Sequence, residues 1–285
     1  MNKLILENLV CPKCKNFLYK KNDKFACKIC CKEYVYRDGK IYFSNLNEAD
    51  IIDSLDKLKY ILKKFSKFYY FLIYLISPVY VDGQVKKFIK QNLSEDNNSI
   101  FINLGSGNSN VNNKILNVDI FDYDNVNIVC DISTLPFADN SVDNIINIAV
   151  LEHVSDPKII VKEIKRVLKP GGKICCFFPF IQAFHASPYD FTRVTSEGIK
   201  ELFKDFKIES IKVSGGPASG FLWILQDFLA ILFSFGSKKL FSVFQLFFML
   251  VLFPIKFLDI ILRFHPMAKN ISSGFLLIGE KNDTI

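Results

Sequence analysis

Short apolar runs that alternate with polar segments constrain the fold of this 285-residue chain most strongly. Near-continuous apolar runs of four to eight residues are typical of parallel strands that are buried on both faces. Between the fourth and fifth runs, 156–168 repeats apolar residues at helical spacing behind Asp156, a helix-capping residue. We therefore predict an α/β fold with a doubly wound, mostly parallel sheet of seven strands. The predicted strands are 99–104, 115–118, 126–130, 144–149, 173–180, 207–214 and 272–280.

Glycines and polar residues follow the first three of these runs. Gly105, Ser106 and Gly107 come after the first run, and Asp119 closes the second. Asp131 follows the third. Ligands of doubly wound sheets bind where the carboxyl ends of the strands meet. Glycine lets the backbone approach a ligand closely, and a carboxylate accepts hydrogen bonds from hydroxyl or amino groups.

The connection between the first two predicted strands is short. Only ten residues run from Gly105 to Lys114, and a crossover helix needs about that many by itself. We expect a single turn or an irregular loop there. Such a loop would open one end of the ligand site, and it leaves a loss of catalytic activity as an alternative.

Five strings in order resemble the class I S-adenosylmethionine-dependent methyltransferases of the type 11 group. They are "INLGSGNS", "NVDI", "CDISTLPFADNSVD", "AVLEHV" and "LKPGG". The resemblance implies a Rossmann-like methyltransferase domain over 97–285 that binds S-adenosylmethionine. Asn103 stands where many relatives have an acidic residue. The implied cofactor-binding residues are Asn103, Gly105, Ser106, Gly107, Asp119, Ile120, Asp131 and Ile132.

A second segment, "HASPYDFTRVTSEGIKELF", resembles the stretch after the fifth strand in that group. The resemblance places candidate catalytic residues at the rim of the active site, with His185 first and Asp190 second as the base. An equally weighted alternative is that Asp190 and Arg193 pair to brace the loop. The candidates are His185, Asp190, Tyr189, Arg193 and, from the string "AVLEHV", His153.

The N-terminal residues 1–45 contain two Cys-x-x-Cys motifs, "CPKC" and "CKIC". Two such motifs supply four thiolates, which is the ligand set of a structural tetrahedral Zn²⁺ site. We predict zinc bound by Cys11, Cys14, Cys27 and Cys30, with Cys31 as an alternative to Cys30. The segment partly resembles the zinc ribbons that accompany methyltransferases. In a reducing cytosol cysteines do not form stable disulfides, so metal binding is the better interpretation of these motifs.

Charge and hydropathy point to a membrane surface. Residues 1–100 carry 18 Lys and Arg against 11 Asp and Glu, whereas the remainder is neutral. We expect a basic and aromatic helical linker over 46–96, in which the uncharged run 68–81 follows five lysines. Residues 217–268 are strongly apolar and predict a helical insertion between the sixth and seventh strands. The alternative is that these helices cover the sheet or form a dimer interface.

Together these patterns predict a cytoplasmic methyltransferase in peripheral or monotopic contact with an anionic membrane. Its acceptor would be a lipid, a lipid-linked saccharide or another amphiphilic small molecule. One alternative is an RNA methyltransferase, for which the basic first third would bind phosphates. Another is a non-catalytic scaffold with the methyltransferase fold. The sequence leaves the oligomeric state and the accepting atom open.

Overall fold

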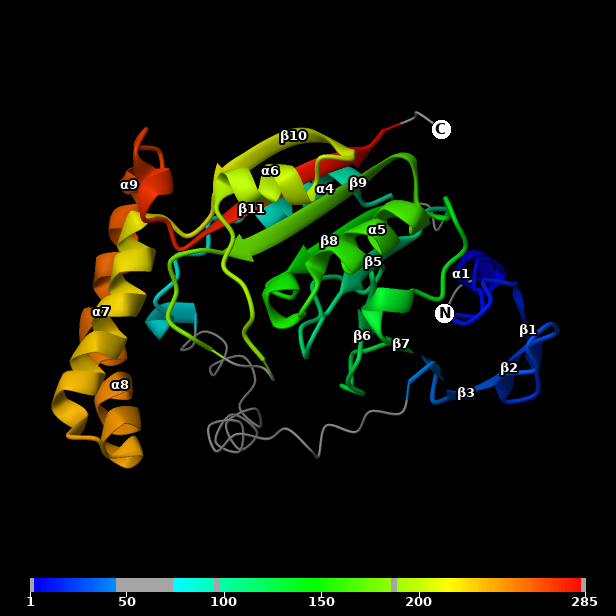
Figure 1. Ribbon diagram of the computed structural model, residues 1–285, viewed down its shortest axis with the longest axis horizontal. Helices are drawn as coiled ribbons and strands as arrows, with labels where there is room; N and C mark the ends of the chain where they lie inside the picture. The colour runs from blue at the N-terminus through cyan, green and yellow to red at the C-terminus, as the bar shows by residue number, and fades with distance from the viewer. Residues whose placement is uncertain (1–2, 45–73, 95–97, 186–188, 283–285) are drawn as a thin grey trace.

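The computed structural model describes residues 3–44, 74–94, 98–185 and 189–282 (Figure 1). Its centre is a sheet with strand order β7-β6-β5-β8-β9-β11-β10, in which only β11 runs antiparallel to its neighbours. The predicted seven-stranded, mostly parallel sheet is therefore confirmed. The strands are β5 (Phe101–Leu104), β6 (Leu116–Asp119), β7 (Ile128–Val129), β8 (Val142–Ile148), β9 (Leu168–Pro179), β10 (Phe206–Val213) and β11 (Gly274–Lys281).

The fifth strand begins earlier than the sequence predicted, at Leu168 rather than at 173. Leu168 already pairs with Val142, and the next pair is Asn144 with Lys173. The segment "KPGG" (169–172) thus forms a bulge in β9, where four residues lie opposite the single residue Asp143 of β8. A proline and two glycines tolerate this distortion, which is why the same residues resemble a strand boundary in sequence.

Helices cover both faces of the sheet. On one face lies α5 (Pro157–Val167), whose N-terminus is capped by Asp156 as predicted, with Oδ1 accepting from the amide of Lys158. Its apolar stripe is buried in the main hydrophobic cluster. On the other face, α4 (Gln84–Asn92) buries Phe88 and Ile89 in a second, smaller cluster. A short helix, α6 (Ser196–Leu202), precedes β10.

The N-terminal ribbon extends the central sheet. It consists of α1 (Lys3–Glu7), β1 (Leu18–Lys21), β2 (Lys24–Cys27), β3 (Glu33–Arg37) and β4 (Lys40–Tyr42). Strands β1 to β4 pair antiparallel, and β4 then pairs parallel with β7 through Ile41 and Ile128. One sheet of eleven strands results, and residues of both parts share one hydrophobic cluster (Figure 1).

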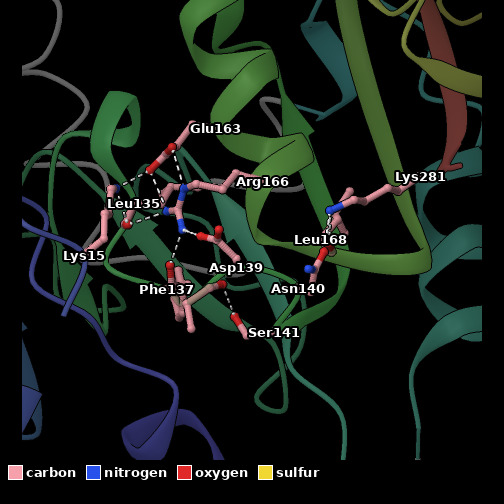
Figure 2. A network of polar contacts seen from close by, with 11 residues as sticks. Lys15, Leu135, Phe137, Asp139, Asn140, Ser141, Glu163, Arg166, Leu168 and Lys281 are labelled. Carbon is pink, nitrogen blue, oxygen red and sulfur yellow. Dashed lines mark hydrogen bonds and ion pairs between the residues drawn. The ribbon is translucent and has the colours of Figure 1, made fainter. Parts of the chain in front are cut away.

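A polar network also joins the ribbon to the central domain (Figure 2). Glu163 on α5 accepts hydrogen bonds from Lys15 of the ribbon at 2.7 Å and from Arg166 at 2.7 and 2.8 Å. Arg166 also donates to the carbonyls of Leu135 and Phe137 at 3.0 and 2.8 Å. Lys15 donates to the same Leu135 carbonyl at 3.3 Å. Charge-assisted bonds of this kind fix the orientation of the ribbon on the sheet.

The apolar insertion is helical, as predicted. It contains α7 (Pro217–Ser234), α8 (Lys238–Leu252), η5 (Phe253–Leu258), α9 (Asp259–Leu262) and η6 (Ala268–Asn270), all between β10 and β11. We call α7 and α8 the hairpin. It stands at one end of the sheet, and its two helices pack against each other (Figure 1).

Buried charges anchor the base of the insertion. Asp259 accepts from the amides of Ala218 and Ser219 at 2.9 and 2.8 Å, at the N-terminus of α7. Lys256 donates to the carbonyls of Tyr74 and Ser77 at 2.6 and 2.8 Å. These charges are satisfied inside the protein, so they leave the apolar face of the hairpin unbroken. The lysines before 68 and residues 68–73 of the run 68–81 lie outside the described residues.

Candidate cofactor and acceptor site

Two glycines in the loop after β5 adopt left-handed backbone conformations, with φ of 67° at Gly105 and 51° at Gly107. Their surroundings differ. A Cβ on Gly105 would lie 2.4 Å from a methyl group of Val150, whereas a Cβ on Gly107 would meet no atom within 4 Å. Gly105 is therefore required for packing against the segment after β8. Gly107 leaves open space beside its Cα, as a bound ligand needs.

No helix connects β5 to β6, and this confirms the expected irregular loop. The loop closes through a turn in which the amide of Ser109 donates to the Ser106 carbonyl at 3.1 Å. The side-chain amide of Asn125 stabilises the loop by donating to the carbonyls of Gly107 and Ser109 at 3.2 and 2.7 Å. Sequence analysis missed Asn125, because its partners are 16 to 18 residues away.

Asp119 at the end of β6 is buried and holds the glycine loop in place. Its Oδ2 accepts from the Gly107 amide at 2.8 Å, and its Oδ1 accepts from the Phe121 amide at 3.0 Å. Burial raises the pKa of this carboxyl, and backbone hydrogen bonds oppose the rise. Each oxygen keeps a further lone pair that can accept from a ligand hydroxyl.

The other predicted cofactor residues lie around the same edge. Asn103 is buried on β5 and donates to Asn117 Oδ1 at 3.1 Å, so the amide at this position is used within the sheet. Asp131 is exposed and accepts from the Ser133 amide at 2.8 Å, which caps the short helix η3 (Ile132–Thr134). Ile132 is buried beneath it, and Ile120 is half-buried after β6.

Two histidines meet at the rim of this edge. His153 lies in η4 (Leu151–His153), just after β8, and His185 lies in the loop between β9 and α6. Their ring centroids are 5.7 Å apart. His185 also stacks on Trp223 of α7, with centroids 5.2 Å apart and planes at 27°. Burial lowers the pKa of His185, which favours the neutral form of its imidazole.

Asp190 and Arg193 form a two-pronged ion pair in the same loop. Asp190 also accepts from the His185 amide at 3.0 Å, and its side chain is 4% exposed. Burial alone would raise the pKa of Asp190, but the Arg193 guanidinium outweighs it and holds the pKa below its usual range. This geometry matches the bracing alternative. Tyr189 is exposed, and its carbonyl contacts His153 Nδ1 at 2.5 Å.

Glu152, which sequence analysis did not single out, lies beside the histidines. Its side chain is 1% exposed, and neither carboxylate oxygen has a hydrogen-bond partner among the described residues. Burial raises the pKa of Glu152 to about 7. The only signal in the sequence is a carboxylate inside the apolar string "AVLEHV". A buried acid in such a place needs a specific reason.

The four predicted zinc ligands converge in the ribbon. Their sulfur atoms all lie within 4.8 Å of one another, with Cys11 Sγ 3.4 Å from Cys30 Sγ and Cys14 Sγ 3.3 Å from Cys27 Sγ. A tetrahedral Zn²⁺ site with Zn–S bonds of about 2.3 Å requires sulfurs about 3.8 Å apart, so the set fits zinc. Cys31 is exposed and is not part of the set.

Comparison with known proteins agrees with this geometry. Residues 103–176 match the family model of a methyltransferase domain. The central part of the chain is thus similar to methyltransferase domains. The match starts inside β5 and ends inside β9, so it contains the glycine loop, Asp119, Asp131 and the string "AVLEHV".

Relatives of the methyltransferase domain match over short stretches. A ubiquinone/menaquinone biosynthesis C-methyltransferase of Desulfotalea psychrophila is 36% identical over 66 residues, 20% of this chain and 27% of that protein. An uncharacterized methyltransferase of Schizosaccharomyces pombe is 50% identical over 42 residues, 15% of each chain. The matches thus span about a quarter or less of these relatives. Among solved structures, Haemonchus contortus phosphoethanolamine N-methyltransferase 2 with S-adenosyl-L-methionine is 17% identical, with a TM-score of 0.43 over 71% of this chain and 53% of that chain.

Proposed function

We propose that the protein is an S-adenosylmethionine-dependent methyltransferase that works at a membrane surface on an amphiphilic acceptor. One observation carries the membrane part. The same helix, α7, stacks Trp223 on His185 at the site rim and presents exposed Phe221, Ile224 and Phe228. One helix thus both borders the candidate site and exposes an apolar face, which supports an acceptor held in the interface close to the site.

The described residues fit the proposed cofactor. Gly107 offers backbone beside open space, and Asp119 offers lone pairs that we assign to ribose hydroxyls. We assign Asp131 to the adenine amino group and Ile132 to packing against the adenine ring. Bound S-adenosylmethionine supplies an activated methyl group on its sulfonium. The protein's task is then alignment and exclusion of water. His185, neutral near pH 7, is the group we assign to take the acceptor proton.

The hairpin carries an apolar surface that fits a lipid interface. Helix α8 has no buried residue, and Val243, Phe247 and Val251 form an exposed stripe at four-residue spacing. Two segments, Pro217–Ser234 and Lys238–Leu262, are long and apolar enough to cross a membrane. Asp227 within α7 accepts from Gln245 of α8 at 2.9 Å, which shields its charge. We favour insertion into one leaflet, because full spanning would place Asp227, in the interior of α7, within the hydrocarbon core.

Zinc has a structural role in this proposal. The four thiolates occupy a closed coordination set, and the Tyr34 hydroxyl lies 3.1 Å from Cys11 Sγ, where it donates to the thiolate. Four protein ligands leave no open position for a substrate. The ion would hold together a ribbon whose own core is small and which docks through β4 and Lys15.

Vesicle flotation with the full chain tests the membrane part. Wild type should float with vesicles of phosphatidylglycerol and phosphatidylethanolamine, and V243D/F247D/V251D should remain in the soluble fraction. A matched control places three aspartates on exposed apolar residues elsewhere, F17D/V35D/I159D. Flotation of the α8 variant, or loss of flotation in the control as well, would contradict membrane binding through the hairpin.

Calorimetry with S-adenosylmethionine tests the enzyme part separately. We expect wild type and the α8 variant to bind S-adenosylmethionine, because none of the proposed cofactor-binding residues lies on α8. No binding by folded protein would favour the non-catalytic scaffold instead. Salt-sensitive binding of RNA without vesicle binding would favour the RNA methyltransferase alternative.

A further inference from the structure

Two of the three histidines in the chain converge on a buried carboxylate. The available ligand atoms of Glu152, His153 and His185 all lie within 4.8 Å of one another. We call these three residues the histidine-glutamate cluster. It is separate from the four cysteines in the ribbon, and it contains a donor set of two imidazoles and one carboxylate.

Backbone carbonyls hold the outer nitrogen of each imidazole. His153 Nδ1 lies 2.5 Å from the Tyr189 carbonyl, and His185 Nδ1 lies 3.1 Å from the Ala183 carbonyl. A carbonyl only accepts, so Nδ1 of the neutral His153 ring carries the proton and its Nε2 presents the lone pair. His185 Nδ1 lies between the Ala183 carbonyl and a donating Arg193 nitrogen at 3.2 Å, so either nitrogen of this ring can present the lone pair. Metal-bound histidines typically have this arrangement, in which the second nitrogen donates to a carbonyl or carboxylate.

Glu152 supplies an independent observation. Its side chain is 1% exposed, its two oxygens have no hydrogen-bond partner among the described residues, and Oε1 lies 3.8 Å from His153 Nε2. A main-chain hydrogen bond of 2.8 Å from the Phe191 amide to the Glu152 carbonyl fixes this segment against the neighbouring loop. A buried carboxylate without partners is costly unless a cation or a ligand satisfies it.

We propose that Glu152, His153 and His185 form a binding site for a divalent metal ion. Two imidazole nitrogens and one carboxylate oxygen suit Zn²⁺ and neighbouring transition metals, and they leave at least one coordination position open. The ligand atoms must approach from within 4.8 Å to about 3.3 Å of one another for tetrahedral Zn²⁺. A displacement of about 1 Å at each ligand atom brings the three atoms to this spacing.

Neighbouring charges are compatible with a cation. Arg193 lies 3.2 Å from His185 Nδ1, but it is paired on two prongs with Asp190, and one of its nitrogens donates to the Ala183 carbonyl at 3.4 Å. The pair has no net charge. Its guanidinium faces Nδ1 rather than competing for the lone pair on Nε2. An added cation would therefore face one unpaired carboxylate, that of Glu152.

The cluster borders the glycine loop, which gives the ion a place in the site. Glu152 and His153 follow Val150, the residue whose methyl groups pack against Gly105. An ion there would have its open coordination position available to an acceptor bound beside the glycine loop. Its use as an anchor for an acceptor oxygen rests on the proposed function, whereas metal binding itself does not. In that use the ion replaces His185 as the group that activates the acceptor, because an imidazole whose lone pair binds a metal takes no proton.

Cobalt titration of the full-length protein in detergent tests the site. Co²⁺ in a four-cysteine site gives a strong thiolate charge-transfer band, and Co²⁺ bound by nitrogen and oxygen gives only weak visible bands. We expect wild type to bind one equivalent of the second spectroscopic type. Glu152→Gln and His185→Asn should each lose that equivalent, whereas His265→Asn, at the third histidine, should keep it.

Thermal melting keeps the test meaningful if a variant folds poorly. With one equivalent of Zn²⁺ already bound in the ribbon, further Zn²⁺ should raise the melting temperature of wild type and of His265→Asn, but not of Glu152→Gln. Glu152→Gln without added metal should melt no lower than wild type, because it removes a buried charge. Absence of a second equivalent in wild type, or its retention in Glu152→Gln and His185→Asn, would overturn the site. Calorimetry with S-adenosylmethionine reports on the proposed function independently.

Discussion

Trp223 on α7 stacks on His185 with ring centroids 5.2 Å apart, although the two residues come from different parts of the fold. His185 belongs to the loop after β9, whereas Trp223 belongs to the apolar hairpin between β10 and β11. This contact places the hairpin at the rim of the candidate site. The contact thus joins two features that the sequence predicts separately, the apolar insertion and the candidate catalytic residue His185.

Removal of the Trp223 ring should affect the acceptor and not the cofactor. An aromatic pair contributes about 0.5–1.5 kcal/mol beyond burial, so Trp223→Ala should lower kcat/KM for an amphiphilic acceptor by roughly 2- to 10-fold. The affinity for S-adenosylmethionine, measured by calorimetry, should stay unchanged. Phe228→Ala, an exposed aromatic on the same helix, serves as the control and should leave kcat/KM in detergent unchanged. Equal losses in both variants would contradict a specific role for the stacking.

The two loop glycines should separate stability from cofactor binding. Gly105→Ala forces a Cβ into Val150 and a left-handed backbone, and we expect it to lower the free energy of unfolding by about 2–4 kcal/mol. Gly107→Ala meets only the backbone penalty, of about 1 kcal/mol. Gly107→Ala should nevertheless weaken S-adenosylmethionine binding, because its Cβ fills the open space. Urea unfolding and calorimetry measure the two effects, and the reverse order of stabilities would be inconsistent with the structure.

The contact between ribbon and central domain should be sensitive to acid. Burial of Glu163 would raise its pKa, but hydrogen bonds from Arg166 and Lys15 outweigh burial and lower it. A lowered folded-state pKa means that the unfolded state binds more protons on acidification. The stabilisation is therefore complete above the unfolded pKa of about 4.3 and is lost as the pH falls through the folded value.

Urea unfolding at pH 7 and pH 3 measures this effect. Glu163→Gln should lower the free energy of unfolding at pH 7 and should flatten its dependence on pH between these values. Glu201→Gln is a matched control, because Glu201 pairs with Lys204 in an exposed i,i+3 position where ion pairs contribute little. An unchanged pH dependence in Glu163→Gln would show that the network does not stabilise the fold.

Loss of zinc should destabilise more than the ribbon. Because β4 pairs with β7 and both parts share one hydrophobic cluster, Cys14→Ser should lower the melting temperature of the whole protein. It should also release the bound zinc, which elemental analysis measures. Cys31→Ser is the control, since Cys31 is exposed and outside the ligand set. Zinc loss in Cys31→Ser, or none in Cys14→Ser, would mean that the ligand set is wrong.

The sequence by itself determined the sheet and the grouping of the four cysteines that we propose as zinc ligands. Strands buried on both faces leave near-continuous apolar runs, so all seven appeared close to their observed positions. The ligands appeared because two Cys-x-x-Cys motifs place their thiolates by local geometry alone. The glycine loop and Asp119 were predictable for a related reason, since parallel strands end at a common edge. The roles of Tyr189 and His153 in catalysis and of the segment 57–73 at a membrane stay predictions.

Only the tertiary structure decided how these parts meet. The pairing of β4 with β7, the support of the loop by Asn125 and the stacking of Trp223 on His185 join residues that are distant in the chain. Glu152 became notable only when its surroundings showed no hydrogen-bond partner among the described residues. Local patterns record which face of an element is buried, but they carry no information about which distant side chain covers it. That choice is made by packing, where shape and the need to satisfy buried polar groups select the partner.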